Sequence, residues 1–166
     1  TIENLMRRCS YRANEDPRDE ITFSLFGMRA MVGLNRAFQN ILNQKPTFVY
    51  EGVRNVSEQL DLIVRYRPGA LRGSPAQIHA LLSEVERTGA DVSFIKTIYT
   101  GGTRFEPQLG QFIKKFMNPT INVNLGGTEY GGMARKKSGD REFDNSAYMG
   151  KLLKTTQVKI VDENLN

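Results

Sequence analysis

Residues 119–132 read Pro-Thr-Ile-Asn-Val-Asn-Leu-Gly-Gly-Thr-Glu-Tyr-Gly-Gly, and the interpretation of the chain starts from them. The β-branched beginning, residues 120–123, predicts a short strand. Paired glycines follow it and carry a hydroxyl, Thr128, and a carboxylate, Glu129. Glycines let a backbone approach a flat ligand closely, a threonine hydroxyl can donate to a phosphate oxygen, and Mg²⁺ binds one or two carboxylates together with substrate phosphates. The stretch thus indicates a nucleotide and a metal after a strand, although taken alone it is also typical of a surface turn.

Strand and helix patterns alternate along the chain. Strand-like runs start near residues 21, 47, 70, 94 and 120, each separated from the next by a helical pattern. This βαβ signature predicts right-handed crossovers and an α/β fold, a parallel sheet of about five strands with helices on both faces. We expect a C-terminal strand over residues 156–161 to begin a separate antiparallel element, and residues 130–148 to form an ordered loop or a short hairpin.

Local signals mark the helices. Asn55 with Glu58, and Ser74 with Pro75 and Gln77, are typical of capped helix starts. The first helix of the α/β unit has its apolar side chains on one face, namely Met31, Leu34, Phe38, Ile41 and Leu42.

A second turn of glycine and hydroxyl groups follows the preceding strand. Residues 100–103 read Thr-Gly-Gly-Thr, directly after the run at 94–99. In open α/β sheets, ligands bind outside the carboxyl ends of the strands. Two such turns at one edge favour a nucleotide site over a surface turn.

The composition is that of a globular protein. The 166 residues fit one domain, no apolar run approaches the length of a membrane span, and the first residues do not resemble a signal peptide. The single cysteine, Cys9, excludes an internal disulfide and favours a reducing intracellular compartment, the cytoplasm or the peroxisome. We expect Cys9 to be a small buried side chain and not a catalytic thiol, and the lone His79 to take no part in a zinc site. The chain begins without methionine, so we expect it to be cut from a longer protein.

The net charge of +5 is spread along the chain, and the densest basic cluster is Arg135-Lys136-Lys137, followed by Arg141. A nucleic-acid-binding surface would gather basic residues on one face, with aromatic residues between them. The sequence predicts a solvated loop here and no nucleic-acid partner.

The order of these landmarks resembles the adenylate-forming enzymes, which include acyl-CoA synthetases, 4-coumarate–CoA ligase and insect luciferase. Residues 100–103 are similar to the family's S-G-G-A turn, and residues 125–129 to its Y-G-x-T-E motif. Residues 149–153 and 158–162 are similar to its V-G-K-P-x-P and V-K-I-V-D stretches. The resemblance covers nearly the whole chain and implies the middle third of such an enzyme. Residues 1–150 would be an α/β subdomain of the large N-terminal lobe, and residues 151–166 would start the following β subdomain.

The resemblance implies activation of a small carboxylic acid with ATP and Mg²⁺, release of pyrophosphate, and transfer of the acyl group to coenzyme A. The partners would be the acid, the nucleotide and the remaining parts of the same chain. Thr128 would contact the α-phosphate and Glu129 would hold Mg²⁺, both as catalytic residues. The nucleotide would be bound by Gly101, Gly102, Thr103, Arg104, Asn124, Leu125, Gly126, Gly127 and Thr128. The acyl pocket would be lined by Arg29, Ala30, Gly33, Gly131 and Gly132.

The sequence departs from the family pattern at two places. Leu125 stands where the family has tyrosine, and residues 27–33 lack the proline and histidine of its P-x-x-H-x-x-G stretch. The phosphate loop and the catalytic lysine of the C-terminal lobe would lie outside these residues, so we expect the fragment alone to be inactive. Three interpretations stay open: the central part of an AMP-forming acid–CoA ligase, a non-catalytic relative that binds a ligand or a partner, and a flavodoxin-like or Rossmann module. The lack of G-x-G-x-x-G after the first strand disfavours the last.

Overall fold

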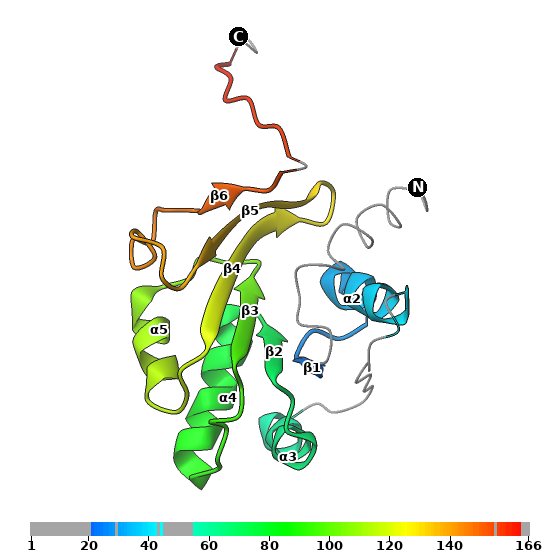
Figure 1. Ribbon diagram of the computed structural model, residues 1–166, viewed down its shortest axis with the longest axis vertical. Coiled ribbons are helices and arrows are strands. Elements are labelled where there is room, and N and C mark those ends of the chain that lie inside the picture. Colours follow the sequence, from blue (N-terminus) through cyan, green and yellow to red (C-terminus); the bar gives the residue numbers. More distant parts are fainter. Residues whose placement is uncertain (1–20, 29, 43, 45–54, 155, 164–166) are drawn as a thin grey trace.

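Six strands form one mixed sheet in the computed structural model, which describes residues 21–28, 30–42, 44, 55–154 and 156–163 (Figure 1). The strands lie in sequence order and are β1 (Thr22–Ser24), β2 (Ala70–Gly73), β3 (Thr97–Gly101), β4 (Thr120–Gly127), β5 (Gly131–Lys137) and β6 (Lys151–Leu152). The helices are α2 (Met31–Leu42), α3 (Val56–Tyr66), α4 (Pro75–Thr88) and α5 (Pro107–Lys114). None of these described helices meets the length and hydropathy needed to cross a membrane.

The predicted α/β fold class is confirmed. Strands β1 to β4 pair in parallel, and β5 and β6 pair antiparallel. The antiparallel strands continue the same sheet and do not begin a separate element, which differs from our expectation. Residues 130–148 do not form a hairpin of their own: residues 131–137 are β5, which pairs antiparallel with β4, and a loop follows β5.

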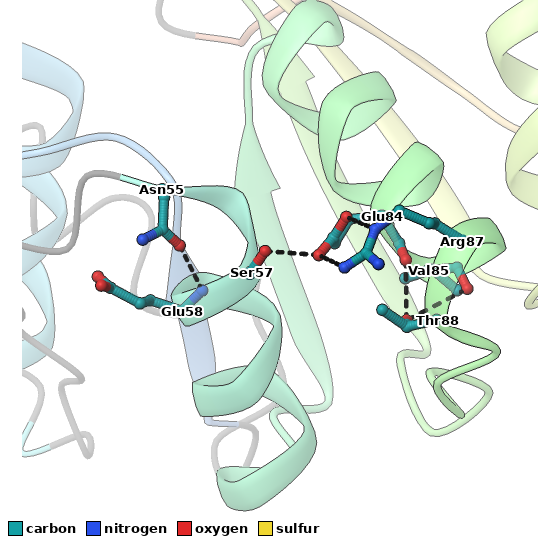
Figure 2. Close-up of polar contacts among 7 residues, drawn as sticks. All are labelled: Asn55, Ser57, Glu58, Glu84, Val85, Arg87 and Thr88. Carbon is teal, nitrogen blue, oxygen red and sulfur yellow. Dashed lines mark hydrogen bonds and ion pairs between the residues drawn. The ribbon is translucent and has the colours of Figure 1, made fainter.

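The capping signals produced the predicted helix ends. Asn55 accepts a hydrogen bond from the Glu58 backbone N–H at 2.7 Å (Figure 2). Ser74 and Gln77 form a reciprocal capping box, with Pro75 in the first turn of α4. Figure 2 also shows Ser57 of α3 donating to the Glu84 carboxylate of α4 at 2.5 Å, so that a polar contact joins the two helices.

The core lies between one face of the sheet and three helices. Phe23, Leu71, Ile98, Ile121 and Val123 point from successive strands into a single buried cluster with side chains of α3, α4 and α5. Figure 1 shows α3, α4 and α5 side by side, and α4 contacts both neighbours. Because side chains alternate across a strand, the residues between these apolar ones face the other side.

The second face of the sheet is polar, and α2 lies on it. Its buried side chains include Arg72 and Tyr99, whose guanidinium carbon and ring centroid lie 4.1 Å apart. Arg36 of α2 donates to the Thr22 hydroxyl of β1 at 3.5 Å. Helices therefore cover both faces, as expected.

Helix α2 buries its small and polar face, although the apolar face of a helix is usually the buried one. Its buried residues are small or polar, namely Gly33, Ala37, Gln39 and Asn40. The apolar side chains point outward: Met31 is 44% exposed, Phe38 42%, Ile41 66% and Leu42 53%. Periodicity correctly placed these apolar residues on one face, but that face turns away from the sheet.

Three further predictions need revision. The strand expected at 94–99 begins at Thr97, because residues 93 and 94 form a turn. Residues 156–161 form no strand, residues 157–161 are exposed, and Figure 1 shows this segment running away from the sheet. The basic cluster 135–137 is part of β5 and not a solvated loop. Cys9 and the strand-like run near residue 47 lie outside the described residues.

Candidate functional site

The two glycine turns follow the carboxyl ends of the neighbouring strands β3 and β4, and β4 runs further than β3. Gly101, the last residue of β3, pairs with Asn124 of β4. The chain leaves β3 through residues 102–106, and β4 continues to a hairpin tip formed by residues 128–130. Thr128 and Glu129 are exposed at this tip, and Gly102 and Thr103 are exposed in the neighbouring turn. Strand pairing thus places Gly101 next to Asn124, and Thr128 lies four residues further along the chain, about 13 Å at the usual strand rise.

The glycines at this edge have different physical roles. A Cβ on Gly101 would lie 2.3 Å from the Asn124 carbonyl oxygen, and one on Gly126 would lie 2.4 Å from the Gly131 carbonyl oxygen. On Gly127 a Cβ would lie 2.7 Å from the Tyr130 ring. These three glycines allow protein segments to approach one another. Gly102, with φ +87°, has no such neighbour within 4 Å, so it is the glycine of these four that offers open space to a ligand.

Asn124 connects three strands beneath the turns. Its carboxamide oxygen accepts a hydrogen bond from Arg135 Nε at 2.8 Å. Its amide nitrogen donates to the Thr100 carbonyl at 3.4 Å. The predicted nucleotide-binding side chain is therefore engaged in holding β3, β4 and β5 in register.

The loop after β5 reaches back to the turn after β3. Arg104 Nη2 donates to the Ser146 hydroxyl, and Arg104 Nε lies 3.1 Å from a carboxylate oxygen of Glu106. One residue after Arg104, the Phe105 ring is buried and lies 5.6 Å from the Phe143 ring, centroid to centroid. The turn that carries Gly102 is therefore in contact with residues 143–146.

Lys136 lies under this contact. Its side chain is 3% exposed, and Nζ donates to the Phe143 and Asn145 carbonyls, both at 3.1 Å. Nζ is also 6.0 Å from the Phe105 ring centroid and 5.5 Å from that of Phe143. Burial lowers the pKa of the Lys136 ammonium, because desolvation penalises the charged form, and the Asp144 carboxylate acts in the opposite direction.

The residues expected in the acyl pocket fall into two groups. Gly131 and Gly132 begin β5 opposite Gly127 and Gly126, next to the hairpin tip. Ala30 and Gly33 lie at the junction of β1 and α2, where a Cβ on Gly33 would be 2.4 Å from the Gly27 carbonyl oxygen. Strand β1 is three steps from β4 in the sheet, about 14 Å at the usual strand spacing. Sheet pairing therefore does not itself join the two groups, and Arg29 lies outside the described residues.

The donor set at the hairpin tip fits magnesium better than zinc. Within residues 21–163, leaving out the segments the structure does not describe, no three His, Cys, Asp or Glu side chains gather as a metal centre would require. A lone exposed carboxylate beside a hydroxyl is consistent with Mg²⁺, which takes its other ligands from substrate phosphates and water. Leu125, where a ring was expected, is half-buried and pairs with Ala134 of β5.

Sequence reasoning missed three residues that shape this edge. Lys136 was placed in a solvated loop, and Phe105 was not singled out. Gly150 has φ +93°, and a Cβ there would lie 2.1 Å from the Arg135 carbonyl carbon. Ala134 and Lys136 share a face of β5, because side chains at i and i+2 lie on one side of a strand. Only the pairing of Lys136 with the core residue Val123 shows that this face is the inner one.

Comparison with known proteins identifies the fold. No curated protein sequence matches the chain. An acyl-CoA synthetase from Brucella canis is similar in structure, with a TM-score of 0.81, 22% identity, and coverage of 98% of this chain and 31% of that one. The amide bond synthetase McbA from Marinactinospora thermotolerans gives a TM-score of 0.79, 18% identity, and coverage of 98% and 33%. The O-succinylbenzoate coenzyme A synthetase MenE from Bacillus subtilis, solved with ATP and magnesium ion, gives 0.78, 18%, and coverage of 98% and 34%.

The chain spans about a third of the length of these structures. The sequence profile of the AMP-binding enzymes matches residues 5–166, which is nearly the whole chain. With the paired turns at the carboxyl edge of a mixed α/β sheet, this match shows that the chain belongs to the AMP-binding enzyme family.

Proposed function

We propose that this chain is the central part of an ATP-dependent acid–CoA ligase, which activates a small carboxylic acid as its adenylate, releases pyrophosphate and transfers the acyl group to coenzyme A. The observation that supports the proposal is the pairing of Gly101 with Asn124, because it joins the two strands that lead into the Gly102 turn and the Thr128–Glu129 tip. Catalysis of adenylyl transfer is mostly positioning and electrostatic stabilisation. A backbone cradle and one metal ligand are the parts that this edge can supply.

Each part has a role in the proposal. The open side of Gly102 receives the base and sugar of the nucleotide, with Thr103 and Arg104 in the same turn. The Thr128 hydroxyl donates to the α-phosphate, and the Glu129 carboxylate would hold Mg²⁺. When bound, the ion would neutralise charge that develops on the phosphate oxygens. Gly131 and Gly132 leave room for the acyl group beside the hairpin.

The rest of the catalytic machinery is proposed to come from the same polypeptide beyond these residues. The outward apolar side chains of α2, Met31, Phe38, Ile41 and Leu42, form a face that a further layer of the chain would cover. We propose that the following β subdomain starts at residue 151, after the turn at Gly150. Strand β6 still pairs with β5, and the chain leaves the sheet over residues 156–163. The single cysteine supports a reducing compartment.

A second candidate is a relative that binds a ligand without catalysis. Leu125 is an aliphatic side chain where the family has tyrosine, and the Tyr130 ring lies over Gly127. Both features favour a weaker or altered nucleotide site.

The test is carboxylate-dependent exchange of pyrophosphate into ATP by the full-length protein, with a broad panel of acids. Exchange with at least one acid is expected. Glu129→Gln should lower the exchange rate about 10²-fold or more, as expected for loss of a charge-stabilising group, and should raise the Mg²⁺ concentration needed for half-maximal rate. Glu86→Gln is the matched control, because Glu86 is exposed and its contact with Lys115, at 3.7 Å, is far from ideal. Nucleotide binding without exchange, for every acid, would favour the non-catalytic relative.

A further inference from the structure

We propose that Lys136 is a positioning residue for the nucleotide turn, holding residues 138–147 against Phe105 so that Gly102 and Thr103 keep one conformation. The inference deepens the proposed function and rests on it for its consequence in catalysis. The structural part of the inference, namely that Lys136 couples residues 138–147 to the turn at 102–104, depends on the contacts alone.

Packing contacts hold both ends of the turn at residues 102–104. At its start, Gly101 packs so closely on the Asn124 carbonyl that no Cβ fits between them. At its end, the buried Phe105 ring contacts the Phe143 and Lys136 side chains. Residues 102–104 bridge these points and are exposed. With few contacts of their own, they take their shape from the two anchors.

Lys136 determines the second anchor. Its partner across the strand is Val123, which belongs to the core, so the lysine stem points to the core side of the sheet. Nζ then reaches two carbonyls of the loop, those of Phe143 and Asn145. Hydrogen bonds from a charged donor are stronger than neutral ones. The loop is thus pinned by the side chain of β5, with the Arg104–Ser146 hydrogen bond as a second contact to the turn.

The surrounding charges are consistent with a held cation. Asp144 and Glu106 favour the charged form of Lys136, while Arg104 and burial disfavour it. The ammonium group lies 6.0 Å from the Phe105 ring centroid and 5.5 Å from that of Phe143, and ring faces attract cations. A neutral side chain of equal length would fill the space but could not donate to the loop.

The experiment compares Lys136→Met, Ser146→Ala and the control Lys115→Met in the full-length protein. Lys115 also lies near a ring, that of Phe112, but is exposed. Hydrogen exchange measured by mass spectrometry should become about tenfold faster in residues 102–106 and 138–147 of Lys136→Met. Ser146→Ala should do the same to a smaller degree, and α4 and β2 should exchange as in the wild type. Unchanged exchange at 102–106, or an equal increase throughout the sheet, would overturn the inference.

Kinetics provide a readout that a purely structural role would not move. The turn contacts the nucleotide equally in the ground state and the transition state, so Lys136→Met should raise KM for ATP about tenfold and leave kcat nearly unchanged. Loss of folded protein alone would lower the apparent kcat at constant KM, and that result would overturn the positioning role. A wild-type protein that neither binds ATP nor exchanges pyrophosphate would contradict the proposed function. The hydrogen-exchange rates of the variants alone would then test whether Lys136 couples the loop to the turn.

Discussion

Replacing Gly101 and Gly102 by alanine, one at a time, separates what the sheet needs from what a ligand needs. The two residues are adjacent, yet the space around them differs. A Cβ on Gly101 would lie 2.3 Å from the Asn124 carbonyl oxygen, whereas a Cβ on Gly102 would meet nothing within 4 Å. Gly102 has φ +87°, which an L-residue rarely adopts.

The magnitudes follow from these surroundings. For Gly101→Ala, the β4 backbone must move by about 1 Å to restore a van der Waals contact. Overpacking of this kind costs about 1–3 kcal/mol, and disturbance of a ladder hydrogen bond adds about 1 kcal/mol. For Gly102→Ala, the left-handed backbone conformation costs about 1–2 kcal/mol. Alanine also lowers the conformational entropy of the unfolded chain, which offsets about 0.4–1 kcal/mol of this cost. Gly101→Ala should therefore be the more destabilising change, by roughly 1–3 kcal/mol.

The assays are native-state hydrogen exchange of the full-length protein, which reports the opening free energy of β3, and calorimetric titration with ATP. Gly102→Ala should nearly retain β3 stability but bind ATP at least about tenfold more weakly, because its Cβ occupies the open side of the turn. Gly89→Ala is the matched control, since Gly89 has φ +69° and open space at the end of α4. Equal stability of the two turn variants would refute the steric argument. Unchanged ATP affinity of Gly102→Ala would refute the placement of the nucleotide over Gly102.

Two other predictions concern stability. Gly150→Ala should detach β6 from β5, and the cost should be limited to about 2–3 kcal/mol because this short pair has few hydrogen bonds. Limited proteolysis near residue 150 should then be faster than in the control Gly139→Ala, since Gly139 has φ +104° but no close neighbour. The Glu84 carboxylate has its pKa lowered from 4.5 to about 2, first by its hydrogen bond with Arg87 and then by that with Ser57. Its stabilising contribution is fully present above pH 4.5 and is lost as the pH falls through about 2. Ser57→Ala should raise this pKa in an NMR titration, and an unchanged value would contradict the contact drawn in Figure 2.

Local chemistry made part of the fold predictable. The caps at Asn55 and Ser74 are decided by groups within a few residues of each other, and both formed as predicted. The alternation of strand and helix patterns predicted an α/β sheet with parallel strands for the same reason, because the hydrophobic period of each element depends only on nearby residues. The two glycine turns were located correctly at the ends of β3 and β4.

The sequence by itself determined the capped helices α3 and α4, the alternation of helices with parallel strands, and which turns carry glycine, hydroxyl and carboxylate groups, since these depend on short-range geometry. It did not determine β5 or the exact start of β3. Only the tertiary structure decided which face of each element is buried. The apolar stripe of α2 turns outward, and Lys136 turns inward beneath Phe105. It also assigned Gly101 to backbone packing and Gly102 to open space. The physical reason is that burial and close approach depend on neighbours far apart in the chain, and periodicity contains no information about which neighbour a face will meet.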